Sequence, residues 1–478
     1  MGSSHRSMLA ALLVFAAAVT TTGCDAILGH ELNSRYCAAH PGDLDCPAPP
    51  VRDANVDAMV DADAADAGPR LCTSDVDCAE TPNTAVCDLV GTRMCVQCTP
   101  NDSASCSGAT PVCSTTNACR ACQVDDECTS SKVCDAAGGS CLAEDTVLYV
   151  SPTGTGALCT QAQPCGQLAI ALGLVAGDKK TIKMLPGSYT ERVTMTNLAV
   201  TIHGQGAALS EAVPGEIIRI TGSATIAMLG LRIHDGLGGS GDGILCTNDA
   251  ENTPVLTLDG VAIDHNGGLG INATKCSISV SGSAVSDSQG VGVSTSGGSL
   301  TISRATVSGN HGGGISAVNG TFDITNTFIT RNGDSSTSAV GGSSLAAATG
   351  SSNRFEFNTV ADNQVKNGGF LSGGVACDIT GFTAPNNIIA HNLINNDTTQ
   401  PTSNTNGLCT YPTSSVTASL TSLNFTSPDN MPYDYHLLPG SSAINQGTTP
   451  SMIRIDRDGD ARPQGAANDQ GADEAVQN

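Results

Sequence analysis

The sequence predicts an all-β protein: a parallel β-solenoid of about 22 residues per coil, preceded by a small disulfide-rich module and a disordered linker. A repeat of apolar residues after position 145, a dense run of cysteines before it and an unusual composition lead to this expectation. Glycine supplies 54 of the 478 residues, aromatic residues 3% and charged residues 14%. Such a composition disfavours a helix-rich domain with an aromatic core and favours a repetitive β structure.

The charge and the cysteine content narrow the class of protein. The chain carries 45 acidic and 21 basic side chains, a formal net charge of −24. This charge would repel polyphosphates, so we expect no nucleic-acid partner. Its 21 cysteines suit an oxidising compartment better than a reducing cytosol.

Residues 1–23 predict a secretory signal peptide. His5 and Arg6 form a short basic start, and residues 8–19 are an unbroken apolar run. This run is too short to span a bilayer in the mature protein.

The residue that follows, Cys24, is a candidate lipid attachment site. A small-residue stretch that ends in Gly-Cys resembles a bacterial lipoprotein box, although Thr21 stands where that motif usually has leucine. Setting Cys24 aside leaves 20 cysteines, an even number that could form ten disulfides. We therefore expect an outer-membrane or cell-surface lipoprotein that contacts the membrane through its acyl chains. The alternative is an extracellular protein with an ordinary signal peptidase site, in which Cys24 forms a disulfide.

Residues 24–70 predict a disordered, acidic linker rich in Ala, Asp and Pro. Positions 25–70 hold nine acidic side chains against three arginines. Such a segment cannot bury enough apolar surface to offset its chain entropy. A calcium loop would need a turn glycine and a closing glutamate, so we interpret the segment as a tether.

Residues 71–144 predict three disulfide-bonded units of four cysteines each. The units are Cys72, Cys78, Cys87 and Cys95; Cys98, Cys106, Cys113 and Cys119; and Cys122, Cys128, Cys134 and Cys141. Each unit is too small for a hydrophobic core, which favours disulfides. A zinc ribbon is the alternative, but two further cysteines fall inside the ribbon spacing and histidine is absent between residues 41 and 202. The arrangement resembles the short Cys-rich repeats of secreted bacterial proteins.

The strongest pattern in the chain is a repeat of 22 residues. Ile263, Val285, Val307 and Ile329 follow one another at this interval. The same interval relates Leu256, Ile278, Leu300 and Phe322; Leu258, Val280, Ile302 and Ile324; and Ile271, Val293 and Ile315. Apolar residues alternate within each unit, as in LTLDGVAID and ISVSGSAVS, which is strand periodicity. Strands that return to the same face every 22 residues indicate coils stacked about 4.8 Å apart.

A polar column accompanies the apolar ones. Three residues after each anchor stand Asn266, Ser288, Asn310, Asn332, Asn363 and Asn392. Asparagine tolerates the left-handed turn conformation, and stacked amides satisfy their own donors and acceptors. We therefore expect a structural ladder.

Several segments together resemble the right-handed parallel β-helix, or pectin-lyase-like, surface proteins. These are YVSPTGTG, CGQLAIALGLVAG, LPGSYTERV, the asparagine column, YHLLPGSSAINQG and DRDGDARPQGAANDQGADE. The resemblance implies a β-helix over residues 145–445, with an N-terminal cap at residues 168–175 and a capping tail at 446–478. The remaining cysteines are then expected to pair as Cys37 with Cys46, Cys159 with Cys165, Cys246 with Cys276, and Cys377 with Cys409.

Enzymes of that family cleave acidic polysaccharides with stacked carboxylates that bind calcium and an Arg or Lys base, or with clustered aspartates. Two residues after each anchor runs a column of Asp235, His265, Asp287, Gly309, Arg331, Asp362 and His391. From it we take His265, Asp287 and Arg331 as weak catalytic candidates. His265 and Asp287 are one coil apart, about 5 Å, and could form a general base pair. At a turn edge we favour a surface ion pair instead. Asp235, Asp242 and Asp264 form a second acidic group.

Three aspartates near the C-terminus are weak calcium candidates. Asp456, Asp458 and Asp460 alternate around Gly459, as at the start of a calcium loop, but a closing glutamate is not evident. A structural calcium ion is the one cofactor we consider, and we favour a plain turn.

We expect a monomeric, non-enzymatic, surface-anchored protein that presents a rigid face to a glycan or a surface protein, in an adhesion or cell-envelope role. The chain has no tryptophan, and tyrosine is absent between Tyr189 and Tyr411, so the repeat offers little aromatic surface for sugar rings. The alternative is a polysaccharide lyase or glycoside hydrolase of the same fold.

Lipidation of Cys24 is directly testable. Cells that express the chain should incorporate radiolabelled palmitate into it, and Cys24→Ser should abolish the label because the thiol is the attachment point. Label that persists in the variant would contradict the assignment.

Overall fold

The computed structural model describes residues 71–80, 84–248, 252–336, 338–347, 352–366, 371–400, 403–448 and 451–476. The expected signal peptide, Cys24, the linker, Cys37 and Cys46 lie outside these residues. The description below concerns the compact unit that begins at Cys72. Across the described ranges, no helix has the length and apolar character needed to cross a bilayer.

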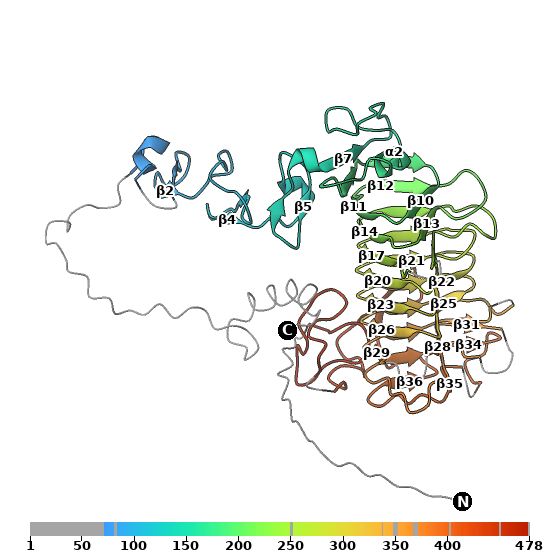
Figure 1. The fold of residues 1–478 in the computed structure, drawn as a ribbon. Helices are drawn as coiled ribbons and strands as arrows, with labels where there is room; N and C mark the ends of the chain where they lie inside the picture. The colour runs from blue at the N-terminus through green and yellow to red at the C-terminus, as the bar shows by residue number, and fades with distance from the viewer. Residues whose placement is uncertain are drawn as a thin grey trace, which may run out of the picture. The chain divides into compact units, whose positions relative to one another are not determined.

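The solenoid is a parallel β-helix with three long sheets, as the sequence predicts (Figure 1). Sheet 1 contains β7 (Val147–Val150), β8 (Thr181–Met184), β11 (Ala199–His203), β14 (Thr225–Leu229), β17 (Val255–Asp259), β20 (Ser277–Ser281), β23 (Ser299–Ser303), β26 (Thr321–Thr325) and β29 (Arg354–Glu356). Sheet 2 contains β10 (Val193–Thr196), β13 (Ile218–Thr221), β16 (Ile244–Thr247), β19 (Ile271–Thr274), β22 (Val291–Ser296), β25 (Gly313–Val318), β28 (Ser343–Ala346), β32 (Val375–Cys377) and β35 (Thr405–Gly407). Sheet 3 contains β9 (Gly187–Thr190), β12 (Ala207–Ser210), β15 (Arg232–His234), β18 (Ala262–Asp264), β21 (Ala284–Ser286), β24 (Thr306–Ser308), β27 (Phe328–Thr330), β30 (Thr359–Ala361), β33 (Ile388–Ala390) and β36 (Ser415–Thr417). A short parallel pair, β31 (Gln364–Val365) and β34 (Leu393–Ile394), extends two of the coils.

The apolar columns predicted from the 22-residue interval are confirmed. Ile263 pairs with Val285, Val285 with Val307 and Val307 with Ile329. These side chains are at most 1% exposed and belong to one continuous core. Burying such aliphatic side chains stabilises the fold by about 1.5–3 kcal/mol each.

The asparagine column is a buried ladder. Each amide nitrogen of Asn310, Asn332 and Asn363 donates to the Oδ1 of the next asparagine, at 2.9, 2.9 and 3.0 Å. The expectation that these asparagines adopt the left-handed conformation is wrong, because the positive φ angles fall one residue earlier, as at Asp287 (54°) and Arg331 (58°). The asparagine itself must point inward, where Asn310 also donates to the Val285 carbonyl at 3.0 Å.

The first coil is covered by the short helix α2 (Leu168–Leu172), within the range expected to cap it. Leu168, Ala171 and Leu172 are buried in the solenoid core. The carboxylate of Glu191 accepts hydrogen bonds from the backbone amides of Leu168 and Ala169, at 2.6 and 3.0 Å. A helix cannot pair with the open strand edge, so it shields the apolar side chains of the first coil.

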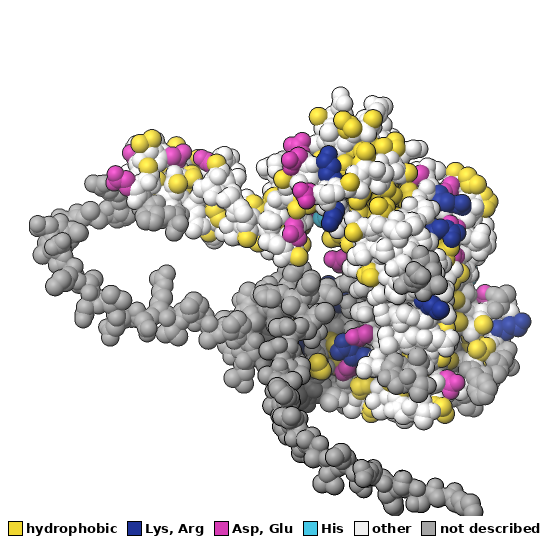
Figure 2. Space-filling view, in the orientation of Figure 1, with side chains coloured by type: hydrophobic (Ala, Val, Ile, Leu, Met, Phe, Trp, Pro, Cys, Tyr) yellow, Lys and Arg dark blue, Asp and Glu magenta, His cyan; other side chains and the backbone are white. Residues whose placement is uncertain are grey.

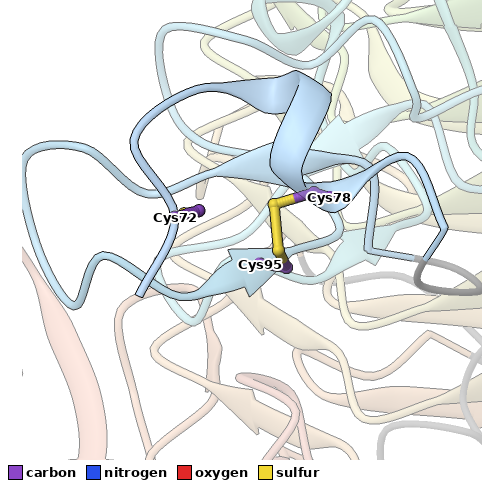
Figure 3. Close-up of side chains that lie close together, drawn as sticks. All are labelled: Cys72, Cys78 and Cys95. Carbon is purple, nitrogen blue, oxygen red and sulfur yellow. A yellow bond between two sulfur atoms is a disulfide. The ribbon is translucent and has the colours of Figure 1, made fainter. Parts of the chain in front are cut away.

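The Cys-rich module consists of disulfide-bonded units, as expected. In each unit the first cysteine pairs with the third and the second with the fourth: Cys72–Cys87, Cys78–Cys95, Cys98–Cys113, Cys106–Cys119, Cys122–Cys134 and Cys128–Cys141. Figure 3 shows the Cys78–Cys95 bond with Cys72 beside it. Each unit has one antiparallel pair, formed by β1 (Val86–Cys87) and β2 (Cys95–Val96), β3 (Val112–Cys113) and β4 (Cys119–Arg120), and β5 (Cys134–Asp135) and β6 (Ser140–Cys141). Short 3-10 turns are η2 (Asp75–Cys78), η3 (Asp125–Glu127) and η4 (Glu144–Thr146). The expected pairs Cys159–Cys165, Cys246–Cys276 and Cys377–Cys409 are also present.

The third cysteine unit is joined to the first coils by a buried charge cluster. Asp125 of η3 accepts a hydrogen bond from the Lys183 ammonium at 2.6 Å and lies 3.1 Å from His203 Nδ1. The Tyr149 hydroxyl donates to the Ser131 carbonyl at 2.7 Å. Burial would raise the pKa of Asp125, but its bonds to His203, Lys183 and a backbone amide lower it to about 2.

The C-terminal residues pack against the outer face of sheet 3. They begin with the antiparallel hairpin of β37 (Phe425–Ser427) and β38 (Asp434–Leu437). Phe425, Tyr435 and Leu437 form an apolar cluster with Phe328 and Ile388 of sheet 3. Strands β27, β30 and β33 are consequently buried along their whole length, whereas β21 and β24 are not. The tail, expected to cap the solenoid, lies along its side.

Val285→Asp should destabilise the β-helix by several kcal/mol, because it places a charge between Ile263 and Val307 in the core. Denaturant unfolding measures the loss. Ser286→Asp, on the neighbouring outward position, is the control and should cost far less. An unchanged free energy of unfolding for Val285→Asp would show that this column is not buried.

Asp125→Asn should weaken the junction in a pH-dependent way. A depressed native pKa means that the stabilisation is complete above about pH 4 and is lost as the pH falls towards 2. The melting temperature of the variant should therefore lie below that of the parent at pH 6, and the two should converge between pH 4 and pH 2. Asp126→Asn, which changes the exposed neighbouring side chain, should follow the parent throughout. A constant difference across this range would contradict the assignment.

Candidate functional site

A cleft of about 650 Å³ lies between sheet 3 and the C-terminal hairpin. Sheet 3 and its turns contribute Asp287, Phe328 and Arg331, and the C-terminal residues contribute Tyr433, His436 and Arg457. Its volume is within the range typical of small-ligand sites. On the face shown in Figure 2, charged side chains occur in small groups on a largely uncharged solenoid surface.

The turn after each sheet 3 strand explains how charged side chains reach this side of the solenoid. Asp287 follows β21 and Arg331 follows β27, and both have the left-handed backbone conformation. Gly309 has the same conformation one coil away from each. Because strands stack in register, residues in this turn column form a row along the edge of sheet 3.

His265, the first catalytic candidate, is not among the residues that line the cleft. Its Nδ1 lies 2.9 Å from Oδ1 of Asp264, and this hydrogen bond raises the pKa of His265. Asp264 also accepts two bonds from Arg232, at 2.8 and 2.7 Å. Burial would raise the pKa of Asp264, but the bonds from Arg232 and His265 lower it. His265 thus belongs to an ion-pair cluster around Asp264, with Asp287 contributing a weaker charge interaction.

Arg331 lies against Tyr433 of the hairpin. The guanidinium carbon is 3.8 Å from the centroid of the Tyr433 ring, and Nη1 donates to the Pro428 carbonyl at 3.1 Å. Burial would lower the pKa of Arg331, but a hydrogen bond and a charge interaction with Tyr435 raise it. Tyr433 remains 42% exposed, so its ring stays accessible.

Two further residues of the turn column, Asp362 and His391, form the contacts that hold the hairpin against sheet 3. The Tyr435 hydroxyl donates to Oδ2 of Asp362 at 2.5 Å, and His391 Nδ1 lies 2.5 Å from Oδ1 of the same carboxylate. Burial raises the pKa of the Tyr435 phenol. Asp362 therefore positions β38, the hairpin strand that contributes Tyr435 to the cleft.

A second cationic group stands on the tail side of the cleft. His436 Nδ1 bonds to Asp434, and Nε2 lies 2.7 Å from Oδ2 of Asp458. The hydrogen bond to Asp458 raises the pKa of His436 to about 9 against the effect of burial, and Asp434 adds to the shift. Arg457 lies 4.6 Å from the centroid of the Phe328 ring and donates to the Thr306 hydroxyl at 2.7 Å.

The calcium candidates Asp456, Asp458 and Asp460 lie in a tight turn around Asp456, whose side chain is its centre. Its Oδ1 accepts the backbone amides of Asp458, Gly459 and Asp460, each at 2.9 Å, and its Oδ2 accepts that of Glu474 at 2.9 Å. Asp456 is fully buried. Its oxygens thus hold the turn together, while Asp458 points to His436.

Asp287 and Arg331 thus line one cleft, and His265 lies elsewhere. Sequence reasoning missed Tyr433, His436 and Arg457, which come from the tail. A signal was present, because Phe425, Tyr433 and Tyr435 fall within eleven residues of a chain that is only 3% aromatic.

The chain is similar to one protein family over part of its length and to solved structures over more of it. The model of a family of unknown function, DUF8331, matches residues 46–147, which include the Cys-rich module. No curated protein matches the chain. Among solved structures, the crystal structure of pectate lyase Pel9A is similar, with 18% sequence identity over 69% of this chain and 96% of that chain and a TM-score of 0.49.

Proposed function

We propose that this chain is an exported, non-enzymatic β-helix protein of the cell envelope that binds an acidic glycan in the cleft between sheet 3 and the C-terminal hairpin. The observation that carries the proposal is the stacking of Arg331 on Tyr433 at 3.8 Å, inside a cleft of about 650 Å³. Stacked strands form one wall, so the binding groups are held in place before the ligand arrives, which lowers the entropic cost of binding.

The charge of the cleft favours an acidic ligand. Arg331, Arg457 and His436 line it as cations, against the carboxylates of Asp287 and Asp434. Arg457 and His436 also pair with Asp458, at 2.9 and 2.7 Å, so Arg331 is the cleft cation that forms no ion pair with a described carboxylate. It stands in a chain of net charge −24. A sugar carboxylate can pair with a guanidinium, and the half-exposed Tyr433 ring offers an apolar face to the sugar ring.

The protonation state of the cationic side chains favours ligand binding over acid–base catalysis. A raised pKa keeps Arg331 a guanidinium, which is suited to holding an anion and unsuited to removing a proton. Both ring nitrogens of His436 are engaged by carboxylates, so the imidazole is held as a cation.

The proposal also includes export of the protein from the cytoplasm and its attachment to a membrane through Cys24. The described residues contain nine disulfides, a density typical of exported proteins. With Cys24 lipidated, residues 25–70 would tether the folded part to a membrane surface.

The second candidate is a polysaccharide lyase or glycoside hydrolase. The observation that favours it is that Asp287 and His436 line the same cleft, since a carboxylate and an imidazole are common acid and base groups.

The test is binding of the purified, oxidised chain to polygalacturonate, alginate, chondroitin and neutral glycans by calorimetry. We expect binding to acidic glycans, and roughly tenfold weaker binding by Tyr433→Ala because a stacking contact is lost. Tyr433→Phe keeps the ring and should bind as the parent does. His265→Ala lies outside the cleft and serves as the control.

The same mixtures should be followed for new reducing ends and for the ultraviolet absorbance of unsaturated products, with and without calcium. Turnover that is abolished by Asp287→Ala would replace the binding proposal with the enzymatic one. Absence of glycan binding, or binding that Tyr433→Ala leaves unchanged, would refute the cleft as the site.

A further inference from the structure

One cluster in the tail brings together three side chains that can each bind a metal ion. His436, in the hairpin's second strand β38, lies near Asp458 and Asp473 from later parts of the chain, and one ligand atom of each lies within 4.8 Å of the other two. His436 also packs edge-on against Phe328 of β27, with ring centroids 5.2 Å apart, so the cluster lies against sheet 3.

The orientation of His436 matches that of a metal ligand. Asp434 bonds to Nδ1, which leaves Nε2 directed at Asp458, 2.7 Å from its Oδ2. Metal-binding histidines commonly donate their other ring N–H to a carboxylate in this way, which sets the tautomer and aims the second nitrogen. A metal ion at this site would displace the proton that His436 Nε2 shares with Asp458.

Asp473 supplies an independent indication. It is 8% exposed, and its Oδ2 accepts the backbone amide of Leu437 at 2.7 Å. Its Oδ1 accepts no hydrogen bond from any residue that the structure describes. Oδ1 is not one of the fully enclosed polar atoms without a partner, so solvent reaches it and it stays accessible to a metal ion.

We propose that His436, Asp458 and Asp473 form a binding site for a divalent transition-metal ion of the Zn²⁺ class, with Asp434 as the positioning residue. An imidazole nitrogen and two carboxylate oxygens suit zinc and its neighbours, whereas calcium and magnesium prefer oxygen ligands alone. The site differs from the calcium loop considered at Asp456, Asp458 and Asp460. It shares His436 and Asp434 with the glycan cleft, but zinc is titrated without glycan, so failure of zinc binding and failure of glycan binding are distinguishable.

The structure also defines the conditions of the test. Three groups of cysteines lie close enough to hold a metal, but all their members are in disulfides. The chain must therefore stay oxidised, be stripped with a chelator and carry no polyhistidine tag.

Titration calorimetry with ZnCl₂ and CaCl₂ measures binding, and Co²⁺ gives a visible spectrum that reports its ligands. We expect one zinc ion that depends on His436, weaker calcium binding, and cobalt bands that His436→Ala abolishes. Asp434→Asn should weaken zinc binding about 10–100-fold and shift the cobalt bands, as loss of a positioning carboxylate does. His391→Ala, in a His–Asp pair outside the cluster, should bind zinc as the parent does.

Asp458→Asn provides a second variant that is suited to retain the fold, because its side chain is 41% exposed. It should also lose zinc binding, with an unchanged circular dichroism spectrum. Zinc binding that His436→Ala and Asp458→Asn leave intact, or no zinc binding by the folded parent, would overturn the proposal.

Discussion

The structure depends on one constraint: each coil must bury its inward side chains against those of the coils on either side. Strand pairing keeps Ile263, Val285, Val307 and Ile329 in one column, so a 22-residue interval in the sequence becomes a straight stack in space. The same constraint aligns everything at a fixed offset from the anchor. The buried asparagine ladder and the row of left-handed turn residues both follow from it.

Stacking constrains the inward side chains but not the outward ones. The outward residues therefore differ in size from coil to coil, and this difference determines where the candidate site lies. Outward residues of β21 and β24 are small, whereas those of β27 and β33 include the larger Phe328 and Ile388. The larger apolar residues are buried because they pack against the C-terminal segment. The cleft lies where the covered strands meet the uncovered ones, so Asp287, Arg331 and Tyr433 lie within it.

The periodic parts of this fold could be predicted from the sequence, and the aperiodic parts could not. Equal spacing identifies which residues share a column. The three disulfides of the described solenoid could be predicted because each joins two cysteines that lie near one another along the chain or on successive coils. The cleft depends on the contact between Arg331, which belongs to the repeat, and Tyr433, which belongs to the non-repetitive C-terminal segment. Spacing in the sequence does not predict such a contact. Spacing also cannot say which residue of a turn is left-handed; that depends on whether the asparagine amide must reach an inward carbonyl such as that of Val285.

The tail is held by a different kind of interaction from the coils, and this explains its composition. Without a repeat it cannot stack apolar columns, and its centre is instead the fully buried ion pair of Arg462 and Glu474, at 2.8 Å. The Arg462 guanidinium also donates to the carbonyls of Asp469 and Gly471 and lies 4.4 Å from the Phe357 ring centroid. Three hydrogen bonds and the ring contact hold the guanidinium, whereas its Nε has no partner among the described residues. Removing one partner of a buried ion pair is costly, so such a network admits few alternative arrangements. The aspartates of DRDGDARPQGAANDQGADE therefore act first as a scaffold, and this scaffold sets the positions of Asp458 and Asp473 beside the cleft.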